Sequence, residues 1–337
     1  MCIRDRIQGS IDIEMHPPPG RAKDIYSQYC DLSAEAVRRY GALDLIVWPE
    51  SMFPEIWFTY DEGARVPAEW EGPPEDFLPA LHRAALAGRR SIAELAHQFR
   101  TPLLLGIDRW HYDAQGVKHF NTAIHVAASG EVLASYAKMH LVMFGEYVPL
   151  SGWFPGLREL KPVNRLNLTL DPGDKPAAFE LSTLRVAPNI CYESVLPHVI
   201  RRQVRALAAE GREPHVLVNL TNDGWFWGSS ELEMHFVCGV FRAVECRKPF
   251  LIAANTGISG WIDADGRIRA RGPKRQTATL LAEPAPDARN SWYLRYGDWP
   301  AGICLCACVA LAAVGCWSRR RTGTTPASPP TDRQRSG

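Results

Sequence analysis

Short apolar runs separated by polar residues recur along the chain and predict alternating strands and helices. Mostly apolar runs of strand length lie at residues 43–47, 103–107, 122–126, 132–136, 178–181, 184–187, 216–220 and 251–254. Apolar side chains at helical spacing mark residues 24–40 and 81–99, and a further helix-like stretch covers 236–245. This alternation predicts an α/β protein. It does not by itself distinguish a doubly wound sheet from a four-layer α-β-β-α sandwich.

Three of these runs lead to side chains that together could carry out acyl transfer. Each reactive side chain follows one run: Glu50 after 43–47, Lys138 after 132–136, and Cys191 after 184–187. Loops at strand ends are common positions for catalytic groups, because the sheet holds them rigidly. The pattern therefore predicts a Glu–Lys–Cys site.

The three residue types suit that chemistry. A cysteine attacks a carbonyl as its thiolate, and a free thiol with a pKa of about 8.5 is mostly protonated at neutral pH. Glu50 could take the thiol proton, and Lys138 could stabilise the oxyanion on the attacked carbonyl. A single cysteine in such a place is more often a buried core thiol. Among nine cysteines, however, only Cys191 lies between an apolar run and a polar turn, with Glu193 close behind.

These residues resemble the carbon–nitrogen hydrolase, or nitrilase, superfamily. That resemblance rests on 45–50 (LIVWPE), 136–141 (YAKMHL) and 189–193 (NICYE). Further blocks, in order, resemble the apolipoprotein N-acyltransferase branch: 144–149 (FGEYVP), 219–226 (NLTNDGWF), His235, 242–245 (RAVE) and 255–257 (NTG). The similarity covers about residues 7–317, and it implies a four-layer α-β-β-α sandwich.

The resemblance also implies a role for each site residue. The expected catalytic residues are the general base Glu50, the oxyanion stabiliser Lys138 and the nucleophile Cys191. The expected supporting residues are Glu146, which would orient the lysine, Glu193, which would fix the thiol's surroundings, and Tyr192, whose backbone N–H would face the oxyanion. His235 is expected to pack or form hydrogen bonds rather than act as a base. The resemblance implies neither a cofactor nor a metal.

The implied reaction is a ping-pong acyl transfer. An acyl group would pass from a phospholipid to Cys191, and then to the amine of a diacylglyceryl-cysteine at the N-terminus of a lipoprotein. The expected partners are therefore a phospholipid donor, a lipoprotein and a membrane.

An uncharged apolar run at 299–317 is long enough to cross a bilayer as a helix. Aromatic residues flank it, and arginines follow at 319–321. By the positive-inside rule the C-terminus is expected in the cytoplasm and the catalytic domain on the outer, periplasmic face of the bacterial inner membrane. A buried core helix is the less favoured alternative. The Pro/Ser/Thr/Arg-rich tail at 318–337 is expected to be disordered.

The N-terminus differs from the family pattern. Family members resemble a bundle of membrane helices followed by the hydrolase-like domain, so we expect this chain to be truncated. Residues 1–6 are expected to be a non-native leader, and residues 7–290 the catalytic domain.

Two connecting segments leave alternatives open. The Pro/Gly-rich stretch at 57–79 is expected to be either a mobile lid beside Glu50 or an ordered surface excursion. The stretch at 153–176 carries Trp153, Phe154 and Leu157; we favour burial of these side chains against the domain over their insertion into a bilayer.

Composition excludes some functions and leaves two rivals. A formal net charge of +1 gives no electrostatic basis for binding nucleic acid. The cysteine spacing matches neither a zinc site nor a regular disulfide framework. The first rival is an amidase acting on a small soluble amide, which would have no use for an apolar helix at 299–317. The second is a membrane-tethered protein that binds lipid or lipoprotein without turnover.

Overall fold

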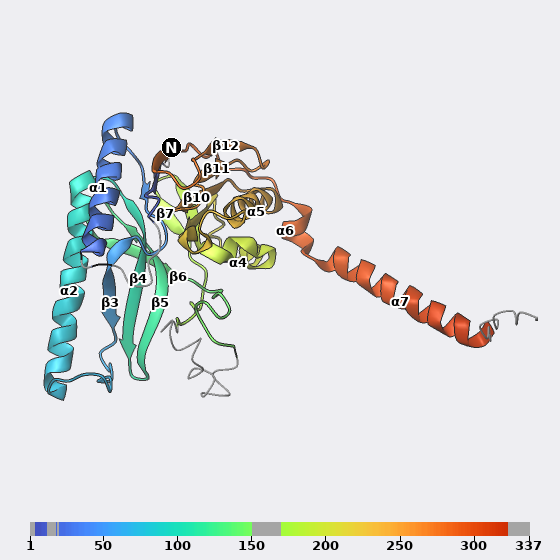
Figure 1. The fold of residues 1–337 in the computed structure, drawn as a ribbon, viewed down its shortest axis with the longest axis horizontal. Helices are drawn as coiled ribbons and strands as arrows, with labels where there is room; N and C mark the ends of the chain where they lie inside the picture. Colours follow the sequence, from blue (N-terminus) through green and yellow to red (C-terminus); the bar gives the residue numbers. More distant parts are fainter. Residues whose placement is uncertain (1–3, 12–17, 19, 150–169, 323–337) are drawn as a thin grey trace, which may run out of the picture. The chain divides into compact units, whose positions relative to one another are not determined.

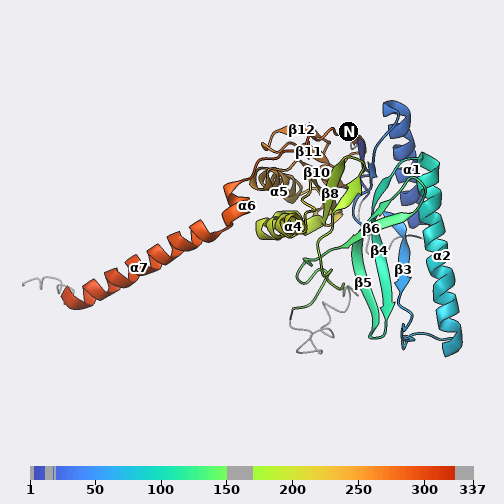
Figure 2. The same cartoon turned by 180° about the vertical axis from the view of Figure 1, so that it is seen from behind.

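The computed structural model describes residues 4–11, 18, 20–149 and 170–322. The chain divides after Leu294 into two compact units. In the first unit two β-sheets lie face to face, and helices cover their outer faces (Figure 1; Figure 2 shows the same layers from behind).

The first sheet has the strand order β13-β1-β2-β4-β5-β6, with β3 also paired to β4. Its strands are β1 (Arg4–Gln8), β2 (Ile46–Val47), β3 (Phe53–Tyr60), β4 (Leu103–Asp113), β5 (Gly116–Val126), β6 (Val132–Ala137) and β13 (Ala278–Leu281). The second sheet has the order β12-β11-β10-β9-β8-β7. Its strands are β7 (Phe179–Leu181), β8 (Leu184–Ile190), β9 (Val216–Thr221), β10 (Phe250–Ala254), β11 (Gly260–Ile262) and β12 (Ile268–Arg271).

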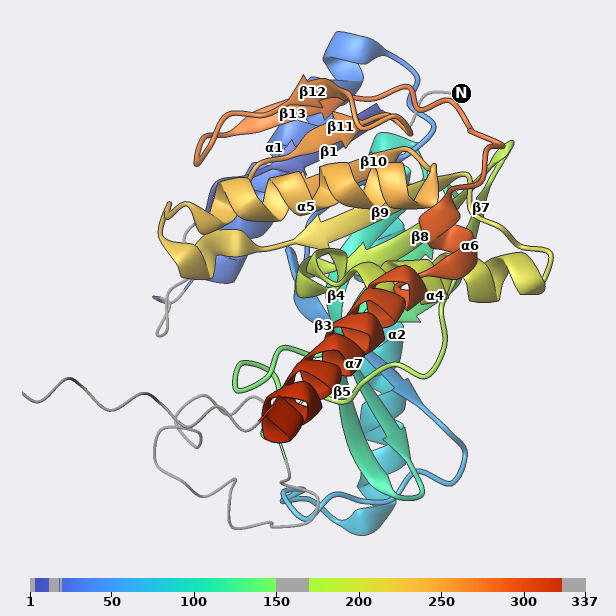
Figure 3. The same ribbon diagram turned by 90° about the vertical axis from the view of Figure 1, so that its right-hand side faces the viewer.

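Helices complete the outer layers. The first sheet is covered by α1 (Arg21–Tyr40) and α2 (Pro74–Phe99), and the second by α4 (Pro197–Ala209) and α5 (Glu231–Cys246). Figure 3 shows α5 lying along the second sheet next to β9 and β10. Two 3₁₀ turns, η2 (Cys191–Val195) and η3 (Asp223–Phe226), follow β8 and β9.

Hydrophobic clusters between adjacent layers hold the four layers together. Side chains alternate along each strand, so Ile46 packs under α1 and α2 whereas Val47 faces the second sheet. In the second sheet, Val216 and Val218 face the first sheet and Leu217 packs under α4 and α5. Because both of their faces are buried, the central strands β9 and β10 are mostly apolar. The predicted four-layer sandwich is confirmed.

Several predicted boundaries were wrong. Helix α2 begins at Pro74 rather than at residue 81, because proline is well tolerated in the first turn and the helix continues through Pro79. Strand β3 occupies part of the segment predicted as a loop at 57–79. Beyond β3 that segment packs on the domain, since Trp70 lies against the buried cluster that includes Leu81 and Tyr112. These contacts favour the ordered excursion over the lid.

The second predicted connection, 153–176, lies largely outside the described residues, and so do Trp153, Phe154 and Leu157. Its described end returns to the site. Gly173 N–H donates to the Lys138 carbonyl at 2.8 Å, and Leu170 N–H donates to that of Glu146 at 2.9 Å.

Strand β1 begins earlier than expected, at Arg4, and pairs antiparallel with β13. Residues 4–6 thus take part in the first sheet. Their assignment to a non-native leader is not tested by this pairing and stays a prediction.

The second unit contains one long helix. After α6 (Trp292–Tyr296), α7 spans Trp299–Thr322. Its segment Trp299–Arg319 is long and apolar enough to cross a membrane, and none of its most apolar part is buried. The predicted C-terminal apolar helix is therefore confirmed. Most of the tail predicted to be disordered lies outside the described residues.

Candidate active site

The three predicted reactive residues meet between the two sheets. Glu50 follows β2 and Lys138 follows β6, both in the first sheet, while Cys191 directly follows β8 in the second. The buried ammonium group of Lys138 interacts electrostatically with both Glu50 and Cys191. The structure therefore brings together side chains that are far apart in the sequence.

Glu50 is held from both sheets. Its Oε1 accepts a hydrogen bond from Asn121 Nδ2 at 2.6 Å, and its Oε2 accepts one from the Asn222 backbone N–H at 2.9 Å. Lys138 Nζ lies 3.4 Å from Oε1. The loop can lie this close to β4 because Gly106 has no side chain; a Cβ there would lie 2.2 Å from the Pro49 carbonyl oxygen. The carboxylate is thus fixed, and the Glu50 side chain is 9% exposed.

Lys138 is almost fully buried between two carboxylates. Its Nζ lies 2.6 Å from Glu146 Oε1, and Glu146 is held in turn because its Oε2 accepts the Val142 N–H at 2.8 Å. Burial acts to lower the pKa of Lys138, but the negative charges of Glu50 and Glu146 outweigh it and raise that pKa. Lys138 is therefore a fixed cation at neutral pH.

Cys191 adopts an uncommon backbone conformation at the start of η2. Its φ of 51° is in the left-handed region, which costs a residue with a side chain roughly 1–3 kcal/mol. Burial, and next the charge of Glu50, raise the pKa of the Cys191 thiol, while Lys138 and the Thr221 hydroxyl act in the opposite direction. The resting thiol is therefore protonated, so nucleophilic attack requires a base.

Glu193 connects the loop that carries Lys138 to the strand that precedes Cys191. Its carboxylate is fully buried. It accepts hydrogen bonds from the Tyr136 hydroxyl at 2.8 Å, the backbone N–H groups of Met139 and His140 at 2.8 and 3.0 Å, and the N–H of Ile190 at 2.7 Å. Burial raises the pKa of Glu193, and these donors oppose the rise. Glu193 thereby fixes the separation of β6 and β8 at the site.

Tyr192 lies beside the site with its side chain half-exposed. Its ring centroid is 6.2 Å from that of His140. The expected contribution of its backbone N–H to an oxyanion site stays a prediction, as do the catalytic and supporting roles of the other residues.

Several groups that hold the site were given no role from the sequence. Asn121 and Asn222 bind Glu50, and Tyr136 binds Glu193. Asn121 carried one signal: it is a polar residue directly before the strand-like run at 122–126, and it is buried there. The hydrogen-bonding role predicted for His235 is confirmed, because its two ring nitrogens contact Asp223 and the Cys191 loop.

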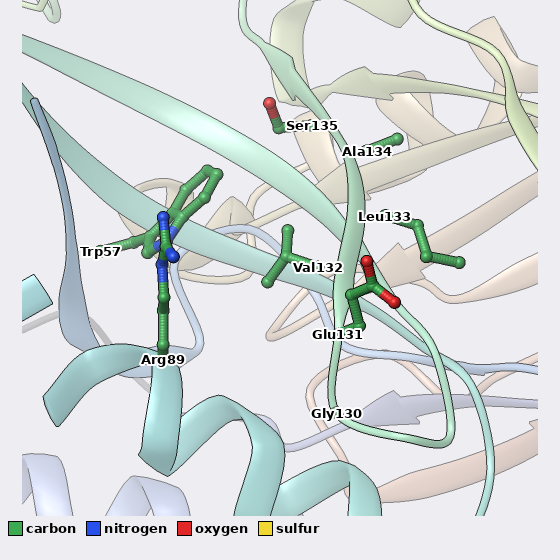
Figure 4. A pocket seen from close by; sticks show the side chains of 8 residues that line it. All are labelled: Trp57, Arg89, Gly130, Glu131, Val132, Leu133, Ala134 and Ser135. Atoms are coloured by element: carbon green, nitrogen blue, oxygen red, sulfur yellow. The ribbon is translucent and has the colours of Figure 1, made fainter. Parts of the chain in front are cut away.

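Among the described residues, no cluster of three or more His, Cys, Asp or Glu side chains is placed to hold a metal. A cavity of about 450 Å³ lies where α2 faces the edge strand β6, lined among others by Trp57, Arg89 and Glu131 (Figure 4). None of the three reactive residues lines this cavity, so we do not assign it to the reaction.

Comparison with known proteins agrees with this geometry. Residues 13–293 match the carbon–nitrogen hydrolase family. The chain is 32% identical over 305 residues to an apolipoprotein N-acyltransferase of Rhodopirellula baltica, which covers 84% of this chain and 52% of the relative. It is 33% identical over 308 residues to the protein of that name in Geobacter metallireducens, covering 91% of this chain and 52% of the relative. The chain thus spans about half the length of these relatives.

Solved structures share the fold at low sequence identity. The nitrilase-superfamily protein Nit3 of Saccharomyces cerevisiae superimposes with a TM-score of 0.55 at 15% identity, over 82% of this chain and 88% of that one. An amidase from Nesterenkonia sp. superimposes with a TM-score of 0.54 at 17% identity, over 87% of this chain and 91% of that one. At these identities the likeness concerns the fold alone.

Proposed function

Because the chain belongs to the carbon–nitrogen hydrolase family, we propose that it is the catalytic part of an apolipoprotein N-acyltransferase. It transfers a fatty acyl group from a phospholipid, through a thioester on Cys191, to the N-terminal amine of a diacylglyceryl-modified lipoprotein. The observation that carries this proposal is the Lys138 ammonium group, buried between Glu50 and Glu146 and interacting with Cys191. The name of the relatives in Rhodopirellula and Geobacter supports the choice of substrates.

In the first half-reaction, Glu50 accepts the Cys191 thiol proton as the sulfur attacks the ester carbonyl of the phospholipid. A carbon–sulfur bond forms, and the carbonyl electron pair moves to oxygen, where Lys138 Nζ and the Tyr192 N–H stabilise it. When the intermediate collapses, the ester carbon–oxygen bond breaks. Glu50 returns its proton to the departing alkoxide, so lysophospholipid leaves and the thioester remains.

In the second half-reaction, the acceptor amine attacks the thioester carbonyl. The nitrogen loses a proton to Glu50, the amide forms, and the carbon–sulfur bond breaks. Glu50 then returns the proton to the Cys191 sulfur. The same carboxylate thus serves both halves, which suits a group held in one position by Asn121 and Asn222.

The apolar helix α7 supports the membrane part of the proposal. In this proposal α7 crosses the bacterial inner membrane, the catalytic unit faces the periplasm, and the C-terminus lies in the cytoplasm. The arginines at 319–321, at the C-terminal end of the span, support this orientation.

The test is intact-mass spectrometry of the chain in detergent with a phospholipid donor. We expect one fatty-acyl adduct that hydroxylamine removes, present in the wild type and absent from Cys191→Ala. A matched control is Cys30→Ala, which replaces a buried cysteine on α1 and should keep the adduct.

Other outcomes would contradict the proposal. An adduct that persists in Cys191→Ala would show that the nucleophile is misassigned. Hydrolysis of a small amide, without acylation by phospholipid, would favour the amidase alternative. Phospholipid binding without any adduct would favour a binder that has no turnover.

A further inference from the structure

The backbone carbonyl of Cys191 accepts hydrogen bonds from three side chains. The donors are Asn219 Nδ2 at 3.1 Å, Ser194 Oγ at 3.1 Å and His235 Nε2 at 3.2 Å. These side chains come from β9, η2 and α5, so three different elements fix a single peptide group. That peptide belongs to a residue with a φ of 51°, a conformation that persists where its surroundings enforce it.

His235 makes contacts that require a proton on both ring nitrogens. Its Nδ1 lies 2.9 Å from the Asp223 carboxylate, and its Nε2 lies 2.7 Å from Ser194 Oγ and 3.2 Å from the Cys191 carbonyl. Since Ser194 Oγ donates its own proton to that carbonyl, it accepts one from Nε2. Although burial acts to lower it, Asp223 raises the pKa of His235 to about 9, in agreement with a buried imidazolium.

The surroundings of Asp223 preserve this pair. Its Oδ1 also accepts the Thr221 hydroxyl at 2.7 Å, and Thr221 in turn contacts the Cys191 thiol. A Cβ on Gly257 would lie 2.1 Å from Asp223 Oδ2, so a glycine is required there for the carboxylate to keep its place.

We propose that the buried Asp223–His235 pair is a positioning device that orients the peptide between Cys191 and Tyr192 for oxyanion binding. In a trans peptide the C=O and the following N–H point in opposite directions. Holding the Cys191 carbonyl toward α5 therefore directs the Tyr192 N–H away from α5. A cationic donor on the carbonyl also polarises the peptide and strengthens its N–H as a donor.

Helix α5 holds the other end of η2 as well. Two turns after His235, the buried Arg242 donates to the carbonyls of Ser194 and Val195, both at 3.1 Å, while Glu245 balances its charge. One buried face of α5 thus places a cation at each end of the turn that begins with the nucleophile.

The inference rests on the proposed function only in assuming that Cys191 attacks a carbonyl. Its test compares two reactions of that thiol, followed by intact mass. Acylation by a p-nitrophenyl ester forms an oxyanion, whereas alkylation by iodoacetamide does not. For His235→Ala we expect acylation to fall about 100-fold, the usual effect of losing an oxyanion donor. Alkylation should stay near the wild-type rate.

A conservative variant separates positioning from general loss of structure. In His235→Gln the amide nitrogen can still donate to the Cys191 carbonyl, so acylation should recover to within about tenfold of the wild type. Ser194→Ala keeps His235 and removes one of the three donors, and it should show a smaller loss confined to acylation. His82→Ala, a surface histidine bonded to Tyr60, is the matched control and should change neither rate.

The proposal is overturned if acylation and alkylation fall together in a folded His235→Ala, because His235 would then act on the thiol itself. It is equally overturned if acylation keeps its rate in that variant. If His235→Ala does not fold, the test passes to Ser194→Ala. The proposal is then overturned if acylation and alkylation fall together in that variant, or if its acylation keeps the wild-type rate. If the p-nitrophenyl ester acylates Cys191 but no phospholipid does, the lipid substrate is wrong and this inference stands.

Discussion

Replacing Glu193 by glutamine tests how the two sheets are joined at the site. The carboxylate is fully buried and faces only donors, the Tyr136 hydroxyl and the backbone N–H groups of Met139, His140 and Ile190. Glutamine has nearly the same shape but presents one NH₂ group. With the amide oxygen toward Met139 and His140, that NH₂ group faces the Ile190 N–H.

The magnitude follows from these contacts. One buried backbone N–H loses its acceptor, which costs about 1–3 kcal/mol, and the remaining bonds lose the strengthening that a charged acceptor gives. We expect Glu193→Gln to lower the free energy of unfolding by about 2–4 kcal/mol. Because Lys138 and Cys191 are placed through the same contacts, the acylation rate should fall as well.

The assay is urea unfolding of the catalytic unit, followed by tryptophan fluorescence, with Glu180→Gln as the control. Glu180 is an exposed carboxylate on β7, and its replacement should leave the midpoint unchanged. A wild-type midpoint for Glu193→Gln would refute the reasoning. It would mean that Glu193 is protonated in the native protein, as burial alone favours, and that glutamine reproduces the hydrogen bonds of the neutral carboxyl group.

Three further predictions concern the reactive groups and their supports. Glu50→Gln and Lys138→Ala should each slow thioester formation at least about 10²-fold, measured by quenched-flow mass spectrometry; near-wild-type rates in both would show that the roles are misassigned. Gly106→Ala should displace the Glu50 loop and slow acylation, since its Cβ would lie 2.2 Å from a backbone oxygen in that loop; an unchanged rate would contradict the close approach. The pKa of His235 is raised from 6.5 to about 9, so its ion pair stabilises the fold below about pH 6.5 and this contribution is lost as the pH rises to 9. The Tm should fall over that interval, and the part due to Asp223 and His235 should be absent from His235→Gln.

The sequence indicates the candidate reactive residues because each follows an apolar run that marks a strand. Cys191 lies directly after β8 and Lys138 directly after β6, as their positions beside those runs predicted. Glu50 lies beyond a strand of only two residues, yet the run at 43–47 still marked its place. Side chains buried on both faces of a sheet leave a composition signal that does not depend on the partner strand.

Elements with little burial left no such signal. Strand β12 reads Ile-Arg-Ala-Arg and is mostly exposed, so its apolar content is too low to mark a strand. Strand β3 begins with Phe53 and Pro54 and pairs along one edge of β4 only, where proline is tolerated. Such strands are specified by their neighbours rather than by their own residues.

The contacts across the site could not be predicted from the sequence, for a different reason. Asn121 and Asn222 are 101 positions apart by their numbers, yet both bind Glu50. Their convergence depends on the way the two sheets face each other, which no local pattern encodes.

The reactive centre belongs to neither sheet alone. Glu50 follows β2 of the first sheet and accepts a hydrogen bond from Asn222, which follows β9 of the second. Glu193, in the turn η2 after β8 of the second sheet, accepts hydrogen bonds from backbone groups that follow β6 of the first. The geometry of the site therefore depends on the packing of the two sheets against each other, rather than on the stability of the individual strands. Under the proposed mechanism, we expect mild heat or denaturant that lets the sheets slide by a fraction of an ångström to abolish acyl transfer while the central strands still protect their amides from hydrogen exchange. If the chain acts as proposed, its acylation rate is therefore a more sensitive measure of how the two sheets are aligned than a spectroscopic signal of folding.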